Sequence, residues 1–218
     1  MKLELSKSEL IRLVAKQLNS LFVFDQKNEG ELLSQGVNAA LQQCEYCFAH
    51  TANKYYHEQG QVYFNPFHSG QYSIFLYFLA SSVYSIRKSR STLSDRIYYL
   101  NKCLNGLDLF YEVKMPKIFF LDHPVGSVLG RANYGERFSF SQACTVGNNK
   151  GKYPTFGQDV KMMSGSKVLG NCLIGDKVII SANTYIKDVD IPECSLVFGC
   201  SPNLTIRRKP EIYFMQRC

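Results

Sequence analysis

A repeat of six residues in the second half of the chain limits its possible folds more than any other feature. From residue 156 onward, every sixth position holds a large apolar side chain, and small residues follow several of these positions. The apolar positions are Phe156, Met162, Val168, Ile174, Ile180 and Ile186. Because a helix repeats every 3.6 residues and a strand every two, this period instead predicts a hexapeptide β-helix, in which each unit is one short strand and one turn. We therefore expect one inward side chain per unit, stacked into a continuous core.

The same period extends back toward residue 109, with two irregularities. The earlier apolar positions are Leu109, Met115, Leu121, Val128, Tyr134, Phe140 and Val146, with a shift of one residue before Val128. Between Val146 and Phe156 the step is ten residues, and the intervening stretch GNNKGKYPT is polar and contains glycine. Such a stretch does not fit within a regular coil, so we expect it to project as a loop.

The first half of the chain has helical spacing instead. Apolar residues recur at three- and four-residue intervals over 5–22, which predicts a helix there. Ser6 followed by Glu9 fits a capping box at the start of this helix. Three further helices are expected at about 30–50, 70–87 and 91–104.

The change of period divides the chain into regions. With 218 residues, the chain is long enough for one large domain or two modest ones. The sequence predicts an α+β protein, with helices first and a parallel β-helix after them. The expected regions are an α-helical domain over 1–107, a β-helix over 108–204 and a C-terminal tail over 205–218.

Composition and charge exclude several classes of protein. No stretch reaches the roughly 18 apolar residues that a membrane-spanning helix needs, and the polar start of the chain does not resemble a secretory signal. We therefore expect a cytoplasmic protein with no membrane span. The net charge is +7, but the basic residues are scattered apart from the run RRK at 207–209, and no nucleic-acid-binding signature accompanies them. Attraction of an anionic small molecule is the simpler interpretation of this charge.

Eight cysteines raise the question of a metal site. Without a secretory signal we expect them to be reduced thiols. Cys44 and Cys47, with His50 and His57, have the residue types of a zinc site, but their spacing fits no finger pattern. Cys44, Cys47 and Phe48 instead fit one apolar face of the expected helix. We therefore expect no bound metal.

Four short motifs give the chain a resemblance to a known family. The stretch LDLFYEVKMPKIFFLDHPVG (107–126) resembles the family's VDI…LDHATG, and SQACTVG (141–147) resembles LQSVTLG. SGSKVLGN (164–171) resembles AGAKILGN, and FGCSPNLTIRRKP (198–210) resembles GVPARIVGKP with a slightly greater length. These motifs, with helices before a hexapeptide prism that carries one loop, resemble the serine acetyltransferases over residues 64–210. These enzymes are acetyl-CoA-dependent O-acyltransferases with a left-handed β-helix.

The resemblance implies a catalytic pair. The family's aspartate-to-histidine spacing falls on Asp108 and His123 without a gap, which implies that His123 is the general base and that Asp108 orients it. The chemistry agrees, because attack of a hydroxyl on a thioester requires removal of its proton, and histidine has a reference pKa of about 6.5. A carboxylate behind the imidazole fixes its tautomer. The resemblance further implies that Asp122 contacts the acceptor, and that acetyl passes directly with no covalent enzyme intermediate.

The resemblance also implies where the co-substrate acetyl-CoA binds. Its amide-rich arm is expected along the flank of the prism, where small residues leave the backbone accessible. By resemblance these small residues are Gly147, Ser164, Gly165 and Ala182. Basic residues are expected to meet the phosphates, where charge-assisted hydrogen bonds are strongest. These are Lys187, Arg207, Arg208 and Lys209.

The acceptor-binding residues depart from the family pattern. Lys152 and Tyr153 stand where the family has an arginine-histidine pair, and Asn65 stands where it has an aspartate before proline. Arg131 replaces a glutamate. Lysine keeps a positive charge but lacks the bidentate fork of arginine. These four departures in side-chain chemistry weaken the recognition of an amino-acid zwitterion.

Two acceptors remain open from the sequence. One is L-serine, which gives O-acetylserine for cysteine synthesis. The other is a hydroxyl of a saccharide, such as a surface polysaccharide or its precursor, because Arg131, Lys152 and the net charge suit an anionic sugar and Tyr153 offers a ring to stack on it. A scaffold that has lost its activity is a third interpretation, which the presence of both Asp108 and His123 opposes.

Assembly follows from the same resemblance. Enzymes of this class typically form trimers, with each active site between two prisms, and serine acetyltransferases often pair two trimers through their helical halves. Closed cyclic symmetry is also the general expectation for a homo-oligomer. We therefore expect a homotrimer or a dimer of trimers.

Overall fold

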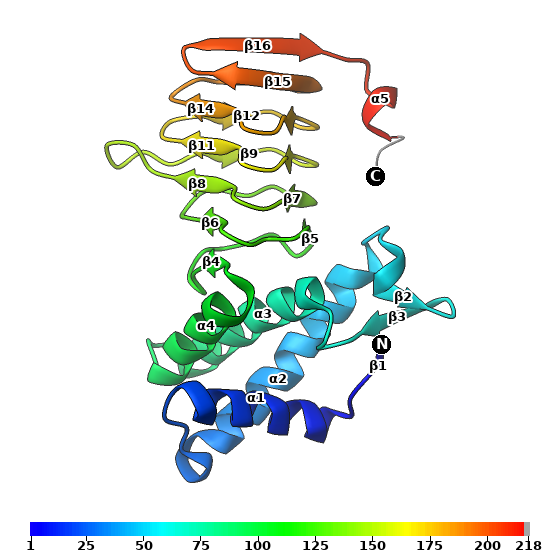
Figure 1. Ribbon diagram of the computed structural model, residues 1–218, viewed down its shortest axis with the longest axis vertical. Coiled ribbons are helices and arrows are strands. Elements are labelled where there is room, and N and C mark those ends of the chain that lie inside the picture. The colour runs from blue at the N-terminus through cyan, green and yellow to red at the C-terminus, as the bar shows by residue number, and fades with distance from the viewer. Residues whose placement is uncertain (216–218) are drawn as a thin grey trace. The chain divides into compact units, whose positions relative to one another are not determined.

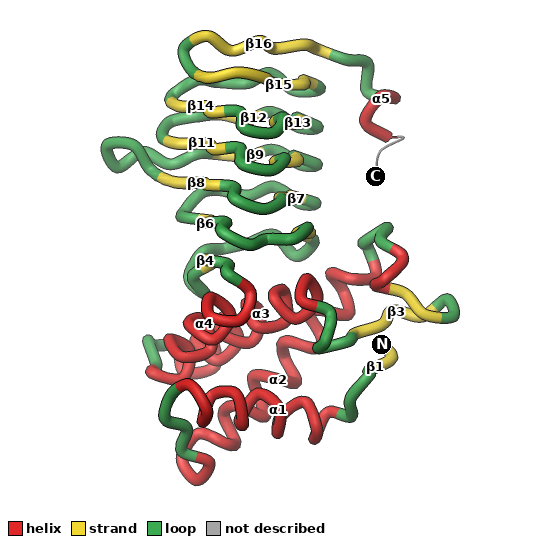
Figure 2. The backbone as a smooth tube through the Cα atoms, viewed as in Figure 1, coloured by secondary structure: helices red, strands yellow, loops and turns green. Residues whose placement is uncertain are grey.

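The computed structural model of the chain describes residues 1–215 and contains two compact units, Met1–Glu112 and Val113–Cys218. The first unit is mainly helical and the second consists of short strands wound into coils (Figure 2). No helix in the described part of the chain is long and apolar enough to cross a membrane. The finer division of the sequence at residues 107 and 204 stays a prediction.

In the first unit, the predicted helices are confirmed in order and place (Figure 1). Their bounds are α1 Lys7–Leu21, α2 Gln26–Ala49, α3 Ser69–Arg87 and α4 Thr92–Asn105. The capping box of α1 is confirmed, because Ser6 N–H donates to the Glu9 carboxylate at 2.9 Å and Glu9 N–H donates to the Ser6 hydroxyl at 3.4 Å. Helix α2 begins earlier than predicted, because the Asp25 carboxylate accepts hydrogen bonds from the N–H groups of Lys27 and Asn28.

Short strands before, between and after the helices complete this unit. Strands β2 and β3 form an antiparallel hairpin after a 3₁₀ turn, and β1 pairs with β3 in parallel. The bounds are Lys2–Leu3 for β1, Lys54–Tyr56 for the 3₁₀ turn, His57–Glu58 for β2, Gln61–Phe64 for β3 and Asp108–Leu109 for β4. The hairpin was not predicted from the sequence.

Helix α3 packs against both α2 and α4 and contributes more buried apolar residues to the core of the unit than any other element. The approach of α2 to α3 is close at Gly36, where a Cβ atom would lie 2.7 Å from Cγ2 of Val83. Cys44 and Cys47 are buried on the packed side of α2, so their assignment to an apolar helix face is confirmed.

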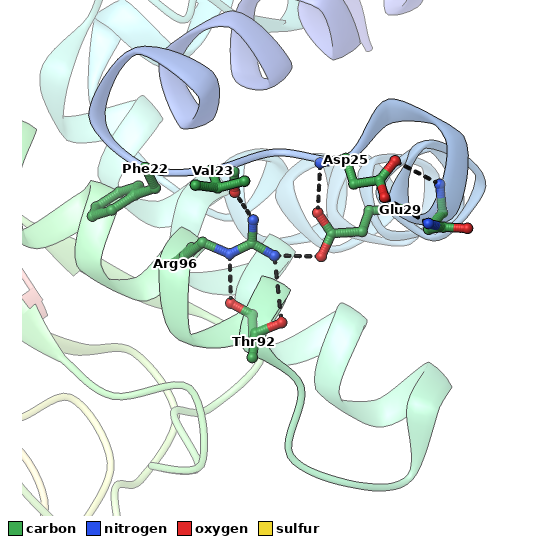
Figure 3. Close-up of a pocket in the computed structure, with 7 residues that line it drawn as sticks. Phe22, Val23, Asp25, Glu29, Thr92 and Arg96 are labelled. Carbon is green, nitrogen blue, oxygen red and sulfur yellow. Dashed lines mark hydrogen bonds and ion pairs between the residues drawn. The ribbon is translucent and has the colours of Figure 1, made fainter.

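Arg96 on α4 holds the connection between α1 and α2 (Figure 3). Its guanidinium donates to the carbonyl oxygen of Val23 and to the carboxylate of Glu29, and its Nε donates to the Thr92 carbonyl at 2.9 Å. The Glu29 carboxylate also accepts a hydrogen bond from Asp25 N–H at 3.0 Å. A pocket of about 530 Å³ lies beside this network. The polar groups that line it form hydrogen bonds with one another.

In the second unit, over residues 113–215, short parallel strands stack into three faces (Figure 1). Face A contains β5 Phe119–Leu121, β7 Phe138–Phe140, β10 Lys161–Met162, β13 Ile179–Ile180 and β15 Ser195–Cys200. Face B contains β6 Val128–Leu129, β8 Thr145–Gly147, β11 Lys167–Leu169 and β14 Tyr185–Lys187. Face C contains β9 Thr155–Phe156 and β12 Leu173–Ile174. Strand β16 (Asn203–Arg208) pairs with β15 in antiparallel fashion, and the short helix α5 (Ile212–Met215) follows.

The six-residue period is confirmed as the pattern of inward side chains. The residues at positions 162, 168, 174, 180 and 186 are buried, and Val168 pairs with Val146 on one side and Ile186 on the other. Near the start of the prism the core is aromatic, with the rings of Tyr134 and Phe156 stacked at 5.4 Å between centroids. The polar stretch 147–155 projects from the stack as the predicted loop (Figure 1).

The register predicted at Val128 is wrong. Val128 is 43% exposed, whereas Leu129 is 1% exposed and pairs with the inward Val146. The reason is an insertion of two residues: β6 begins seven residues after Leu121, whereas the equivalent strands β8, β11 and β14 begin five residues after the preceding strand of face A. Met115, also expected inside, is only half-buried and lies before the first strand of this unit.

We expect Leu129→Ala to lower the free energy of unfolding by about 2–5 kcal/mol, because it removes a buried side chain from a close-packed core. Val128→Ala, one residue earlier on the same strand, is the matched control and should change the free energy by about 0.5 kcal/mol or less. Urea denaturation of the two variants measures the difference. Equal effects at the two positions would contradict the assigned register.

Candidate active site

His123 lies in the extended corner between β5 and β6. Its backbone has φ +48°, in the left-handed region, which costs most residues about 1–2 kcal/mol. The backbone of the corner is fixed, because Asp122 N–H donates to the carbonyl of Phe140 at 3.0 Å and Val125 N–H donates to that of His123 at 2.8 Å. The His123 side chain is 83% exposed. A held backbone therefore presents the imidazole to solvent.

Three further predicted residues lie at the same corner of the prism, which joins face A to face B. Coil-to-coil hydrogen bonds fix the alignment: Ala143 N–H donates to Val125, Gly165 N–H to Gln142, and Asn183 N–H to Ser164, all at 2.9–3.0 Å. We call this column of turns, residues 122–127, 141–144, 163–166 and 181–184, the A–B corner. Of the predicted cofactor residues, the A–B corner holds Ser164, Gly165 and Ala182 in line with His123.

The A–B corner requires glycine at position 165. Its φ is +73°, and a Cβ atom at this position would lie 2.3 Å from Oδ1 of Asn183. Only glycine fits this conformation and this approach without strain. The side chain of Asn183 occupies this space, and the Lys167 ammonium donates to the Gly165 carbonyl at 3.1 Å.

A column of small polar residues supports the A–B corner from inside. The Ser127 hydroxyl donates to the Ser141 carbonyl at 2.8 Å and accepts from Cys144 N–H at 3.1 Å. The Cys144 sulfur lies 3.6 Å from the hydroxyl of Ser166 in the next coil. Cys144 is fully buried, as expected for a thiol that packs as a small apolar group.

Asp122, the predicted acceptor contact, lies beside the base. Its Oδ1 is 3.6 Å from Nε2 of His123, which is beyond hydrogen-bonding distance. The Asp122 side chain is exposed. The two groups are free to contact a ligand at the same point of the corner.

Asp108, the predicted partner of His123, belongs to the first unit and is held by α4. The Tyr98 hydroxyl donates to its Oδ1 and the Lys102 ammonium donates to its Oδ2, both at 2.6 Å. Partial burial favours the neutral acid, but the hydrogen bonds from Lys102 and Tyr98 outweigh it and hold the pKa of Asp108 below its ordinary value. The carboxylate is therefore charged and fixed in place, and its pairing with His123 stays a prediction.

The loop between β8 and β9 carries Lys152 and Tyr153, which are predicted to bind the acceptor substrate. It is a tight hairpin in which Lys150 and Gly151 have φ values of +49° and +76°, as in a type I′ turn. Both acceptor side chains are exposed. Arg131, also exposed, follows the end of β6, where Gly130 N–H donates to the Val146 carbonyl at 2.9 Å.

The structure thus separates two groups of predicted site residues within one prism. Arg131, Lys152 and Tyr153 follow the ends of face B strands, at the edge where face B meets face C. His123 lies at the other edge of face B, on the A–B corner. Asn65 lies in the first unit, where its side-chain oxygen accepts a hydrogen bond from Phe67 N–H at 2.8 Å and shapes the turn before α3.

The remaining cofactor residues are also divided. Gly147 and Lys187 share a column at the far end of face B, with Leu169 paired between them. The Arg207 guanidinium lies 5.8 Å from the ring centroid of Phe198, which extends the A–B corner beyond Ser181. Arg208 is elsewhere, 3.6 Å from the Glu193 carboxylate. Of the basic residues predicted to bind the phosphates, Arg207 is therefore the one placed beside the A–B corner.

Metal coordination has no candidate cluster in the structure. Over residues 1–215, no group of three or more His, Cys, Asp or Glu side chains is placed to hold a metal ion.

Several known proteins with similar sequences are named serine acetyltransferase. No protein-family model matches the chain. Over 150 residues it is 28% identical to the serine acetyltransferase of Bacillus licheniformis, an alignment that covers 66% of this chain and 68% of that protein. Over 137 residues it is 29% identical to the serine acetyltransferase of Staphylococcus epidermidis, covering 61% and 63%. The chain therefore spans about two thirds of the length of these curated relatives.

Solved structures give the same result for the fold. A serine acetyltransferase in complex with cysteine matches with a TM-score of 0.68 at 19% identity, covering 91% of this chain and 84% of that one. Isoform 3 of Entamoeba histolytica serine acetyltransferase, also with cysteine, matches with a TM-score of 0.60 at 22% identity, covering 97% and 76%. The chain is similar in sequence to serine acetyltransferases and has their fold. The predicted fold, a helical region followed by a left-handed parallel β-helix, is confirmed.

In this serine acetyltransferase-like chain, sequence reasoning missed the residues that hold Asp108. Tyr98 and Lys102 lie four residues apart on α4, so both side chains are on one face of the helix. Their four-residue spacing was the only indication in the sequence, because tyrosine and lysine are both common on exposed helices. Gln142, which occupies the A–B corner one coil after His123, was missed as well.

We expect the contribution of Asp108 to stability to disappear in acid. Because its pKa in the folded protein is lowered, the contribution is complete above its ordinary value of 3.8 and is lost as the pH falls through the folded pKa. Asp108→Asn should therefore lower the free energy of unfolding by about 1 kcal/mol at neutral pH and by less below pH 3.8. Urea denaturation at a series of pH values measures both proteins. A difference between them that is independent of pH would contradict the assignment.

Proposed function

We propose that the protein transfers an acetyl group from acetyl-CoA to the hydroxyl of L-serine, giving O-acetylserine for cysteine synthesis. The observation that carries the proposal is the A–B corner, where the exposed His123 is in line with Ser164, Gly165 and Ala182. The names of the relatives support L-serine as the acceptor. Because acetyl-CoA is the donor, the reaction is proposed to take place in the cytoplasm.

His123 acts as the general base in this proposal. Its imidazole accepts the proton of the serine hydroxyl as the oxygen forms a bond to the thioester carbonyl carbon. When the tetrahedral intermediate collapses, the carbon–sulfur bond breaks and the imidazolium returns the proton to the departing thiolate. The reaction therefore needs no covalent enzyme intermediate, and the enzyme ends in its starting state.

Two carboxylates assist the base. Asp108 is proposed to orient the imidazole, and the carboxylate retains acceptor capacity beyond its bonds to Tyr98 and Lys102, because two carboxylate oxygens offer about four lone-pair sites. Asp122, next to the base, is proposed to receive the ammonium group of serine. Opposite charge at an exposed position suits transient binding of a small substrate.

Acetyl-CoA is proposed to lie along the A–B corner. The thioester is at His123 and the phosphates are at the other end, near Arg207. Four coil steps separate the His123 turn from Phe198, which is roughly 19 Å at the usual strand spacing. Ser164, Gly165 and Ala182 lie between them, and the amide-bearing arm is proposed to bind beside these small residues. Gly147, Lys187 and Arg208 lie outside this line and are proposed as secondary contacts at most.

The acceptor site is proposed to form between two chains of a homotrimer. Within one prism, Lys152 and Tyr153 lie at the opposite edge of face B from His123, so a neighbouring chain is needed to bring the two edges together. Lys152 then meets the serine carboxylate, with Arg131 adding positive charge. Because lysine offers a single ammonium in place of a bidentate fork, this grip is weaker than that of an arginine.

Thiol release from acetyl-CoA by the purified protein tests the proposal. The assay compares L-serine with a panel of sugars and surface glycans. We expect turnover with L-serine that requires both substrates. Turnover with a saccharide and none with L-serine would show that the proposed acceptor is wrong and that the proposed acetyl transfer is right. No turnover with any acceptor would overturn the proposed function.

A second test concerns the base. We expect His123→Ala to lower kcat on the order of 10²–10⁴-fold, because proton transfer by a positioned side chain contributes that much. Binding of acetyl-CoA, measured by calorimetry, should be retained. His50→Ala is the matched control, because His50 ends α2 and bonds only locally, to the Tyr46 carbonyl at 2.8 Å. An unchanged rate for His123→Ala would contradict its role.

A further inference from the structure

The hairpin loop between β8 and β9 is fastened to the prism by one carboxylate. The side-chain amide of Asn149 donates to Oδ2 of Asp188 at 2.5 Å. The other carboxylate oxygen, Oδ1, accepts a hydrogen bond from Asn171 N–H at 2.8 Å. Asp188 therefore connects three successive coils: the loop after β8, the turn after β11 and its own turn after β14.

The backbone beneath this contact is shaped to allow it. Gly170 has φ +84°, and a Cβ atom there would lie 2.0 Å from Oδ1 of Asp188 and 2.8 Å from Cβ of Asn149. Gly170 N–H donates to the Gly147 carbonyl at 3.0 Å, and Asp188 N–H donates to the Leu169 carbonyl at 3.1 Å. Because only glycine fits between the two side chains, the contact between Asn149 and Asp188 depends on glycine at position 170.

The hydrogen bond from Asn149 is charge-assisted. Asn171 N–H, followed by Asn149 and the nearby ammonium groups of Lys187 and Lys150, holds the pKa of Asp188 below its ordinary value despite the opposing effect of burial. The carboxylate is therefore charged at neutral pH. Hydrogen bonds to an ionised acceptor are stronger than those between neutral groups.

Backbone hydrogen bonds in the hairpin link Asn149 to the residues that bind the acceptor substrate. Asn149 N–H donates to the Lys152 carbonyl at 3.0 Å, and Lys152 N–H donates to the Asn149 carbonyl at 2.9 Å. Lys150 and Gly151 close the hairpin in left-handed conformations. Fixing the side chain of Asn149 therefore fixes the backbone of Lys152, and Tyr153 is the next residue.

We propose that Asn149 and Asp188 are positioning residues for the acceptor, forming a latch that holds Lys152 and Tyr153 in their binding arrangement before the acceptor arrives. This inference rests on the proposed function of the same site. An ordered loop loses less conformational entropy on binding, so the latch lowers the KM for the acceptor. The KM for acetyl-CoA, which binds at the A–B corner, is not affected.

The latch has a test with a reciprocal rescue. Asn149→Asp places a second carboxylate against Asp188, so the two side chains repel and the latch opens. In the double variant N149D/D188N, the side-chain amide at position 188 donates to the carboxylate at 149, and its oxygen still accepts from Asn171 N–H. The rescue therefore separates loss of the hydrogen bond from general damage to the loop.

Asp176→Asn is the matched control. Asp176 Oδ1 accepts a hydrogen bond from Gln158 N–H at 2.8 Å, and a Cβ atom on Gly157 would lie 2.2 Å from that oxygen. This arrangement has the same turn chemistry as Asp188 over Gly170, but it fastens no loop.

Hydrogen exchange and steady-state kinetics are measured on each purified variant. For Asn149→Asp we expect faster exchange of the amides of Asn149 and Lys152 and about a tenfold rise in the KM for L-serine, the effect of losing about 1.4 kcal/mol. The KM for acetyl-CoA should stay within about twofold, the double variant should regain wild-type values in both measurements, and Asp176→Asn should keep them.

Two outcomes would overturn the inference. Unchanged exchange in Asn149→Asp would show that no latch exists, and faster exchange with an unchanged KM for L-serine would show that the latch does not position the acceptor. Absence of serine turnover in the wild-type protein would instead overturn the proposed function, while the exchange data would still decide whether the hairpin is latched.

Discussion

The hydrogen bonds between successive coils of the prism determine where every side chain of the second unit lies. Corner residues donate backbone N–H groups to the coil before them, as Gly165 does to Gln142, and strand residues donate to the coil after them, as Ser139 does to Val160. Because the coils repeat in register, position within the six-residue unit decides whether a residue faces the core, lies on a face or turns a corner. Residues far apart in the chain, such as His123 and Ala182, thereby share one edge of the molecule.

The sequence predicted the inward side of the prism well, because one apolar residue per short strand is all that the core requires. The error at Val128 has a specific physical origin. Val128 and Leu129 are both apolar, and two inserted residues at the preceding corner leave either one compatible with an approximate period. Periodicity alone does not reveal an insertion at a corner, since corner residues have no apolar signature.

Contacts between distant polar residues could not be predicted from the sequence. The bond from Asn149 to Asp188 and the bonds from Tyr98 and Lys102 to Asp108 join side chains that are individually ordinary for exposed positions. Strand β16 was missed because it runs antiparallel to β15, where the six-residue period has already ended. The family resemblance predicted that Ser164 and the small residues near it belong to one site. This was possible because small residues beside the strands recur at a fixed spacing in the sequence.

The two residues inserted at the His123 corner have a consequence for how such a protein changes over time. The corner is still joined to the next coil, by Asp122 N–H to the Phe140 carbonyl and by Ala143 N–H to the Val125 carbonyl, but the His123 side chain points away from this ladder and is exposed. Exposed side chains such as those of Asp122 and His123 can therefore be replaced without altering the packing of the coils. The stacked coils then stay the same while the chemistry at this corner changes.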